Sequence, residues 1–397
     1  MLPDLGHYHH ARIQAYAERG EADVTVVVVG GKGLFAEFAH RGDRPPAYRT
    51  VTLFPDRFFA DLPAADLGRA VENALAAERC SVVLAQGWAA AYSLAALRWA
   101  VARDVPRVVT SESQRDDFAR SPVKEWVKRR LVGLCGAALC GGTRHAEYAR
   151  DLGVPADRIF LGYDAVDNAH YAAGADAART NPGARTRLGL PPAYLLASAR
   201  FIPKKNLPGL LAGYAAYRAA VGPGAWELVV LGDGAGRPEL EARRGELGLA
   251  GVVHLPGFRG YDALPAYYGL AEGFVHASLV EQWGLVINEA AAAGVPVVAS
   301  DRCGATADLV QPGRTGWAFA PTDSAALGAA LVELHRHPDR RSLGQAGRQL
   351  VAEWGPERFA AGLSAAVAAA TPARRPGLVG RAVLRAVAAR PPVTGGE

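Results

Sequence analysis

Short apolar segments rich in β-branched residues alternate with alanine-rich segments along the whole chain. Most of the apolar segments are continuously hydrophobic, which is typical of parallel strands buried on both faces. A strand followed by a helix, repeated in this way, predicts an α/β protein with parallel sheets. The predicted strands are Val24–Val29, Val82–Leu84, Arg107–Val109, Ile159–Leu161, Leu195–Ala197, Leu228–Leu231, Val252–Leu255, Phe274–His276 and Val295–Ala299.

One segment interrupts this alternation near the middle of the chain. Residues 172–192 lack a regular spacing of apolar residues and contain Gly, Pro, Asn and Asp, which is typical of a linker. We therefore predict one Rossmann-like domain over residues 1–171 and a second over residues 193–352. Residues 353–397 are predicted to form a C-terminal helix and a basic tail. No strand precedes the loop at Gly6, so the first strand of the first domain is expected to be missing or truncated.

The composition is that of a globular protein. The chain has 397 residues, of which 50% are apolar and 21% charged, with a formal net charge of +5. These values exclude a disordered chain, and no run of 18 or more apolar residues predicts a spanning helix. We expect the four cysteines to be reduced thiols of a cytoplasmic protein, without a metal site. Basic residues are scattered and do not interleave with aromatic ones, so no nucleic-acid partner is expected.

The C-terminal segment is basic and amphipathic. From residue 372 onward, arginines and apolar residues recur at helical spacing. Two interpretations stay open: a terminal helix packed on the body of the protein, and a peripheral contact with anionic lipid at the inner membrane face. The arginines concerned are Arg374, Arg375, Arg381, Arg385 and Arg390.

The segment Phe274–Ser300 carries the most informative pattern, a strand, a loop, a helix and another strand. Glu281 lies in the loop, and Glu289 follows eight residues later within the predicted helix. If the helix begins near Gly284, its first backbone N–H groups form an anion site. A diphosphate bound there would have a carboxylate beyond each of its ends.

A basic loop follows the first strand of the second domain. Arg200 and Lys205 lie in this loop, which we expect to face the same side of the sheet as Glu281. One guanidinium and one ammonium group suit a pyrophosphate, both in binding it and in stabilising it as a leaving group.

These motifs, together with Gly232-Asp233-Gly234, resemble a retaining glycosyltransferase of the GT-B fold, glycosyltransferase family 4. The resemblance covers roughly residues 190–350, and more loosely the first half of the chain. It implies two Rossmann-like domains across a cleft, a C-terminal helix that crosses back to the first domain, and no cofactor or metal. It also implies a catalytic set of Glu281, Arg200 and Lys205, with Arg200 and Lys205 on the diphosphate and Glu281 on hydroxyls of the transferred sugar. The further donor-binding residues that it implies are Glu289 at the ribose, the amides near Trp283, Gly284 and Leu285 at a phosphate, and Gly232, Phe258, Arg259 and Gly6.

The chain departs from the family pattern in the first domain. Family members often place a histidine after a strand of this domain, near the donor sugar, whereas here the strand Arg107–Val109 leads into Thr-Ser-Glu-Ser-Gln. Two interpretations stay open: Glu112 or Ser113 substitutes for the histidine, or a member of an N-terminal cluster serves instead. That cluster consists of His7, His9 and His10.

The sequence therefore predicts a retaining, metal-independent transferase that moves a hexose from a nucleoside-diphosphate sugar, with UDP favoured, to a hydroxyl acceptor. On the family resemblance, polysaccharide or lipid-linked glycan assembly is expected. Three alternatives stay open: transfer to a small-molecule natural product, a nucleotide-sugar 2-epimerase, and a non-catalytic nucleotide-sugar-binding protein. Whether Glu281 does more than position the sugar also stays open.

Overall fold

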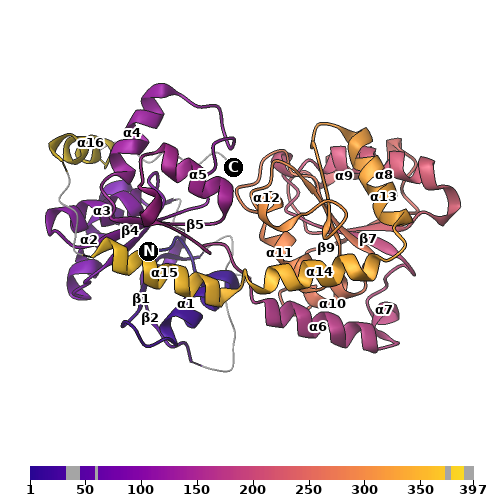
Figure 1. The fold of residues 1–397 in the computed structure, drawn as a ribbon, viewed down its shortest axis with the longest axis horizontal. Coiled ribbons are helices and arrows are strands. Elements are labelled where there is room, and N and C mark those ends of the chain that lie inside the picture. The colour runs from indigo at the N-terminus through magenta and orange to yellow at the C-terminus, as the bar shows by residue number, and fades with distance from the viewer. Residues whose placement is uncertain (33–44, 59–60, 372–376, 389–397) are drawn as a thin grey trace. The chain divides into compact units, whose positions relative to one another are not determined.

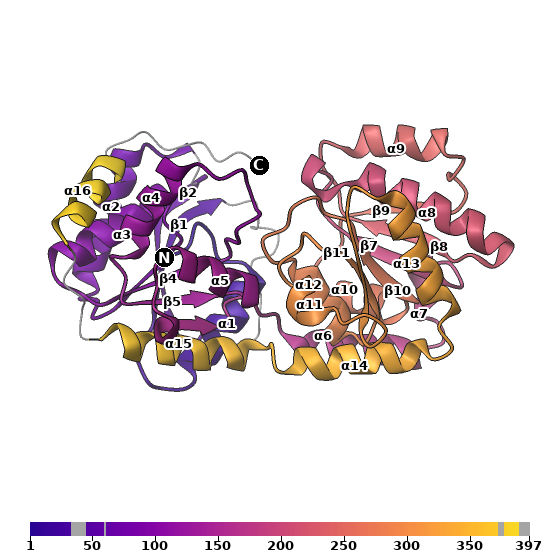
Figure 2. The same ribbon diagram turned by 45° about the horizontal axis from the view of Figure 1, so that its top comes forward.

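The computed structural model describes residues 1–32, 45–58, 61–371 and 377–388 (Figures 1 and 2). The chain divides into two compact units, one that joins Met1–Ala165 with Pro356–Glu397 and one over Val166–Gly355. Every paired strand of each unit is parallel to its neighbour, and helices cover the sheets. The predicted α/β class with parallel sheets is therefore confirmed.

The second unit contains a six-stranded sheet of order β12-β11-β10-β7-β8-β9. The chain starts in the middle of this sheet, adds β8 and β9 on one side, and then crosses to β10 on the other. The carboxyl ends of β7 and β10 therefore flank the point at which the strand order reverses, where open α/β sheets bind their ligands. The strands are β7 (Tyr194–Ser198), β8 (Glu227–Leu231), β9 (Val253–Gly257), β10 (Gly273–His276), β11 (Val297–Ser300) and β12 (Gly316–Phe319).

Helices cover both faces of this sheet (Figure 2). One face packs against α8 (Leu207–Val221), α9 (Arg237–Glu246) and α13 (Ser324–Arg336), where Tyr214 and Tyr217 are fully buried. The Tyr214 hydroxyl donates to the Trp226 carbonyl at 2.9 Å, so the buried polar group is satisfied. The helices associated with the other face are α6 (Asn168–Thr180), α10 (Leu264–Gly269), α11 (Leu285–Ala292), α12 (Thr306–Leu309) and α14 (Arg340–Ala352).

The predicted linker at residues 172–192 is instead largely helical, and it belongs to the second unit. It contains most of α6 and all of α7 (Ala184–Arg187). Asp167 caps α6 by accepting the N–H of His170 at 3.0 Å, and Tyr171, Ala175 and Ala178 form the buried face. A stripe made mostly of alanine has a weak hydrophobic signal, which is why the periodicity escaped detection. The division between the units falls after Ala165 rather than in the predicted linker.

The first unit contains a four-stranded sheet of order β3-β4-β5-β6 and a pair, β1-β2. Leu2 forms a parallel bridge with Val28, and the Met1 amino group donates to the Leu84 carbonyl at 3.4 Å. The first residues thus lie between β1 and β3, and a cavity of about 520 Å³ lined by both strands continues beside them. The expectation that the first strand of this domain is missing or truncated stays a prediction. The strands are β1 (Thr25–Lys32), β2 (Arg49–Phe58), β3 (Val83–Gln86), β4 (Arg107–Ser111), β5 (Ala137–Cys140) and β6 (Ile159–Leu161).

The helices of the first unit include two from the end of the chain. α15 (Pro356–Ala370) packs against α1 (His7–Ala17) through Phe359 and Leu363. α16 (Leu378–Ala388) packs against the two helices α3 (Ala91–Ala102) and α4 (Pro122–Val132). The remaining helices are α2 (Ala64–Ala77) and α5 (Thr143–Asp151).

The structure describes only part of the predicted basic tail. In α16, Leu384 is buried against the core of the first unit, whereas Leu378 is 85% exposed. Arg374, Arg375 and Arg390 lie outside the described residues. The packed helix agrees with one of the two interpretations of this segment, and lipid contact stays a prediction. Among the described residues, no helix is long and apolar enough to cross a membrane.

Candidate functional site

Lys205 and Glu281 meet at the point where the strand order of the second unit reverses. Lys205 ends the short helix Pro203–Lys205 after β7, and Glu281 lies in the loop after β10. The Lys205 ammonium donates to Oε2 of Glu281, and each side chain is only 12% exposed. The structure thus brings together two of the three predicted catalytic residues.

Hydrogen bonds join the two loops that carry this pair. The Leu279 N–H donates to the Lys204 carbonyl at 2.8 Å. Asn206 adopts φ 52°, a left-handed conformation that asparagine tolerates, and its Nδ2 donates to the carbonyls of Ala277 at 3.2 Å and Pro321 at 2.8 Å. The position of the ion pair is therefore fixed by the backbone as well as by the two charges.

Glu281 is held in its ionised form. Ser278 donates to Oε2 of Glu281 at 3.2 Å, and His276 Nε2 lies 3.5 Å from the same oxygen. Burial favours the neutral carboxyl, but the Lys205 ammonium and the bond from His276 outweigh it and hold the pKa of Glu281 well below its usual range. Burial also lowers the pKa of His276. An ionised carboxylate accepts hydrogen bonds only, which suits contacts with sugar hydroxyls.

The helix α11 begins where the sequence predicted. Gly284 caps it with φ 98° and ψ 63°, a conformation that favours glycine, and Leu285 is its first residue. Its first N–H groups have no partner within the helix and carry a partial positive charge. The Trp283 ring is buried, donates to Asn288 Oδ1 at 2.8 Å, and stacks on Trp354 at 5.4 Å. Trp283 can therefore offer a phosphate its backbone but not its ring.

Glu289 belongs to α11 and lies on its buried face. Its side chain is 1% exposed, and the Tyr268 hydroxyl donates to its Oε2 at 2.6 Å. Tyr171 contacts Tyr268 edge-on, with ring centroids 5.9 Å apart. Tyr268 fixes the orientation of the carboxylate, and the predicted contact with a ribose stays a prediction.

The glycines of Gly232-Asp233-Gly234 serve contacts within the protein. Gly232 has φ 119°, and a Cβ there would lie 1.9 Å from the Ala199 carbonyl oxygen. The Phe201 N–H donates to the Asp233 carbonyl at 2.8 Å, so this loop is joined to the loop of Arg200. This close approach of the neighbouring loop explains why glycine stands at position 232, and the predicted contact of Gly232 with the donor stays a prediction. The Arg200 side chain is exposed.

The predicted residues beside the base differ in exposure. The Phe258 side chain is 41% exposed. The Arg259 side chain forms hydrogen bonds within its own loop and to Tyr267. The Arg259 guanidinium donates to the Tyr267 hydroxyl at 2.7 Å and to the carbonyls of Pro256 at 2.8 Å and Phe258 at 2.9 Å. The predicted contact of both residues with the base stays a prediction.

The three predicted histidines at the start of the first unit have different surroundings, and a role for any one of them stays a prediction. Gly6 caps α1, and His7 is 6% exposed. His10 Nδ1 lies 2.7 Å from the Tyr48 hydroxyl, and burial together with Arg12 lowers the pKa of His9 well below its usual value. Within the described ranges no three His, Cys, Asp or Glu side chains could hold a metal ion.

An acidic pair lies after the strands of the first unit. Glu112 follows β4 and Asp164 follows β6, while Arg12 of α1 lies 3.7 Å from Asp164 Oδ1. Burial and the hydrogen-bonded Glu112 carboxyl raise the pKa of Asp164 well above its usual value. The Arg12 guanidinium opposes this shift but does not reverse it. Ser113, the other predicted substitute, donates its N–H to Ser111 Oγ at 3.1 Å.

Sequence reasoning found Glu112 but missed Asp164 and Arg12. The signal for Asp164 was its place shortly after the predicted strand Ile159–Leu161, at a sheet end where polar residues are often functional. Arg12 gave no such signal, because a helical arginine is usually solvent-exposed.

Comparison with solved structures defines the class of fold. Sucrose-phosphate synthase from Thermosynechococcus elongatus superposes with a TM-score of 0.70 at 21% identity, covering 89% of this chain and 90% of that one. HepE of Anabaena, solved in complex with UDP, gives a TM-score of 0.68 at 16% identity, covering 89% and 94%. The fold is therefore GT-B, with two Rossmann-like domains, as predicted.

The sequence comparisons narrow this class. Residues 184–350 match the family "Glycosyl transferases group 1", which confirms the predicted resemblance and makes this segment a domain of that family. A GDP-mannose-dependent α-(1-6)-phosphatidylinositol monomannoside mannosyltransferase of Mycobacterium tuberculosis is 34% identical over 47% of this chain and 50% of its own length. An α-D-kanosaminyltransferase of Streptomyces kanamyceticus is 30% identical over 55% and 56%. The chain thus spans about half the length of the curated relatives it matches.

Proposed function

We propose that the protein is a retaining glycosyltransferase, which moves a hexose from a nucleoside-diphosphate sugar to a hydroxyl acceptor. The observation that carries this proposal is the buried Lys205–Glu281 pair at the β7–β10 switch point, close to the start of α11. This arrangement offers one cationic side chain, one ionised carboxylate and the backbone N–H groups of a helix start. Those groups match a sugar linked to a diphosphate.

The chemistry follows from the charges that develop during transfer. Breaking the anomeric bond creates positive charge on the sugar ring and negative charge on the departing diphosphate. Lys205, Arg200 and the start of α11 would stabilise the diphosphate, and Glu281 would accept hydrogen bonds from the sugar hydroxyls. In a same-face transfer the departing phosphate takes the proton of the acceptor. Because these groups supply the positive charge, we propose that the reaction needs no metal ion.

The proposal also concerns the nucleotide of the donor and the chemical class of the acceptor. The sequence favoured UDP, and the solved HepE structure contains UDP, whereas the mycobacterial relative is named for GDP-mannose. Both donors therefore belong in the first experiment. We propose a glycan or lipid-linked acceptor, as in the sequence prediction, with a small natural product as the alternative that the kanosaminyltransferase likeness favours. Peripheral contact of the basic C-terminal segment with anionic lipid belongs to the same proposal.

A donor screen tests the proposal. The purified protein is incubated with UDP-, GDP-, ADP- and dTDP-sugars, and both the thermal shift and the release of nucleoside diphosphate are followed. We expect one nucleotide sugar to raise the melting temperature and to be hydrolysed slowly in the presence of EDTA, with both effects lost in Glu281→Gln and Lys205→Ala. Arg314→Ala is the matched control, since this exposed arginine bonds only Gln311 among the described residues.

The screen also separates the alternatives. Product analysis that finds an epimerised donor sugar would favour the 2-epimerase. Binding without turnover in the presence of a broad set of acceptors would favour a non-catalytic protein. A chain that is not stabilised by any nucleotide sugar would contradict the proposal.

A further inference from the structure

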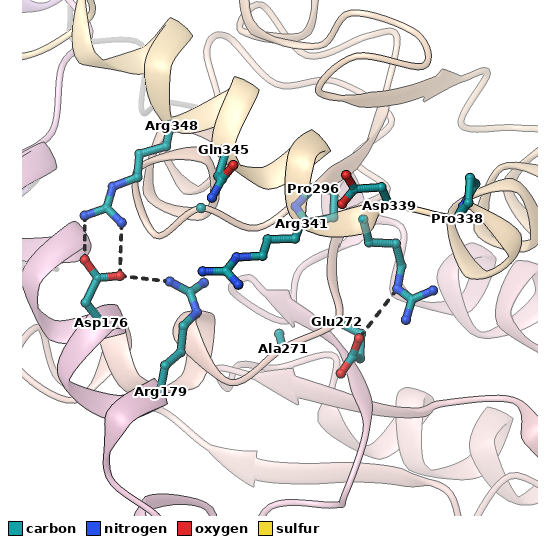
Figure 3. A pocket seen from close by; sticks show the side chains of 12 residues that line it. Asp176, Arg179, Ala271, Glu272, Pro296, Pro338, Asp339, Arg341, Gln345 and Arg348 are labelled. Carbon is teal, nitrogen blue, oxygen red and sulfur yellow. Dashed lines mark hydrogen bonds and ion pairs between the residues drawn. The ribbon is translucent and has the colours of Figure 1, made fainter.

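A second pocket lies at the opposite end of the second unit's sheet (Figure 3). Ala271 and Glu272 directly precede β10, and Gly294 and Pro296 precede β11, so these lining residues mark the amino ends of two central strands. The pocket has a volume of about 670 Å³. Because Lys205 and its partner lie after the carboxyl ends of the strands, this pocket is separate from the proposed donor site.

Arginine dominates the charged lining of this pocket. Two of the three carboxylates that line the pocket already have partners within the protein. Glu272 lies 3.7 Å from Arg340, and Asp339 caps α14 by accepting the N–H of Ser342 at 3.0 Å. The charged groups that remain are Asp176, Arg179, Arg341 and Arg348.

A single carboxylate, that of Asp176, pairs with two of these three guanidinium groups. Asp176 accepts two hydrogen bonds from Arg348, at 3.0 and 2.8 Å, and one from Arg179 at 3.2 Å. Arg179 is further fixed by donating to the Ala293 carbonyl at 2.6 Å. Arg341 makes no hydrogen bond or ion pair with any residue in the described part of the chain, and its guanidinium points toward that of Arg179 (Figure 3). Three positive charges therefore face one negative charge.

The arrangement keeps like charges close together. Burial, and after it the charges of Arg348 and Arg341, lower the pKa of Arg179. Such repulsion is relieved when an anion binds between the cations. Planar guanidinium groups suit the oxygens of a phosphate group, and those of Arg179 and Arg348 are already held in place. Gln345 adds an amide to the lining (Figure 3).

We propose that this pocket binds the dianionic phosphate group of a phosphate monoester, between Arg179 and Arg341, and that it does so independently of the donor site. The phosphate can belong to a soluble ester or to a lipid headgroup, since both present the same oxygens. The site gives the second unit an anion-binding function at the sheet end that the transfer reaction does not use.

Titration calorimetry on the full chain tests this proposal. The soluble probes are inorganic phosphate and glucose 6-phosphate, and the membrane probe is phosphatidylcholine vesicles that contain phosphatidic acid. Arg341→Gln removes the exposed cation and leaves the folded contacts of Arg179 and Arg348 intact. Arg187→Gln is the matched control, because it removes one exposed arginine of the same unit outside the pocket.

We expect glucose 6-phosphate to bind saturably. Arg341→Gln should weaken this binding about tenfold or more, and Arg187→Gln should leave it unchanged. UDP and GDP should not compete with glucose 6-phosphate. Arg341-dependent binding to the vesicles alone would support the site with a lipid as the source of the phosphate. Equal weakening by both variants, loss of binding in Lys205→Ala, or no saturable binding to any probe would overturn the proposal. Because the readout is phosphate binding, its failure is distinct from a failure of the proposed transferase activity.

Discussion

The two sheets carry acidic groups after their carboxyl ends in opposite electrical states. In the second unit, Glu281 is paired with an ammonium group and is ionised. In the first unit, burial and the neighbouring Glu112 carboxyl raise the pKa of Asp164 well above its usual value, although Arg12 lies 3.7 Å away. The same parallel topology therefore builds one site in which a carboxylate faces an ammonium group and one in which two acidic groups lie side by side. The difference teaches that the sheet places polar residues at its end, while the neighbouring side chains decide which chemistry they can perform.

The largest expected effect comes from breaking the pair in the second unit. Lys205→Ala leaves the buried Glu281 without its ammonium partner, so donor turnover should fall by about 10² to 10³-fold. The free energy of unfolding should fall by about 3 kcal/mol, because an uncompensated buried charge remains. Nucleoside diphosphate release and chemical denaturation measure the two effects. A variant that keeps full turnover would remove Lys205 from the proposed machinery.

The next largest expected effect is a loss of stability when a Cβ is added at Gly232 of the second unit. A Cβ at Gly232 would lie 1.9 Å from a carbonyl oxygen, so Gly232→Ala should cost about 3 kcal/mol or more of stability. Gly248 also has a positive φ, of 66°, but nothing within 4 Å of a Cβ, so Gly248→Ala should cost only about 1 kcal/mol. Urea denaturation of both variants measures the difference. Equal losses would mean that the contact with the Arg200 loop is unimportant.

The opposite shifts of the two carboxyl groups predict opposite pH dependences. Because the pKa of Asp164 is raised in the folded chain, this chain binds the proton more tightly than the unfolded chain, in which the carboxyl group titrates at about pH 3.9. Stability therefore falls as the pH rises from there toward the raised pKa, by about 1.4 kcal/mol per pH unit. Asp164→Asn should remove this loss and raise the melting temperature near neutral pH.

Glu281 provides the internal control for this measurement. Its depressed pKa contributes stability that is present above about pH 4.3 and is lost as the pH falls toward the folded value. Glu281→Gln should therefore lose stability at neutral pH, whereas Asp164→Asn gains it. Calorimetric melting between roughly pH 4 and 8 compares the variants. Shifts of the same sign in both variants would contradict the opposite electrical states.

The smallest expected effect concerns Trp283. Trp283→Phe removes the donor to Asn288 but keeps an aromatic ring against Trp354, so stability should fall by about 1 to 2 kcal/mol. Donor affinity should stay within about twofold of the wild type, because the ring does not face the proposed ligand. Denaturation and donor titration measure the two quantities. A large loss of donor affinity would show that the ring acts beyond packing.

The sequence predicted the second unit better than the first. Continuous apolar strands and the Glu281–Gly284 spacing are local patterns, so the parallel sheet and the start of α11 could be predicted from them. The helix α6 could not be predicted, because its buried stripe consists mostly of alanine. The Glu112–Asp164 pair could not either, since it joins residues far apart in the chain whose contact only the folded sheet creates.

The most direct test of the account is a double-mutant cycle on donor binding. Wild type, Lys205→Ala, Glu281→Gln and the double variant are titrated with UDP- and GDP-hexoses by calorimetry, and the affinities are compared. The account predicts that one donor binds the wild type saturably and that the two single losses are non-additive by about 1 kcal/mol or more, because the residues act as a pair. Additive losses, or equal binding by all four proteins, would contradict a donor site built on the Lys205–Glu281 pair.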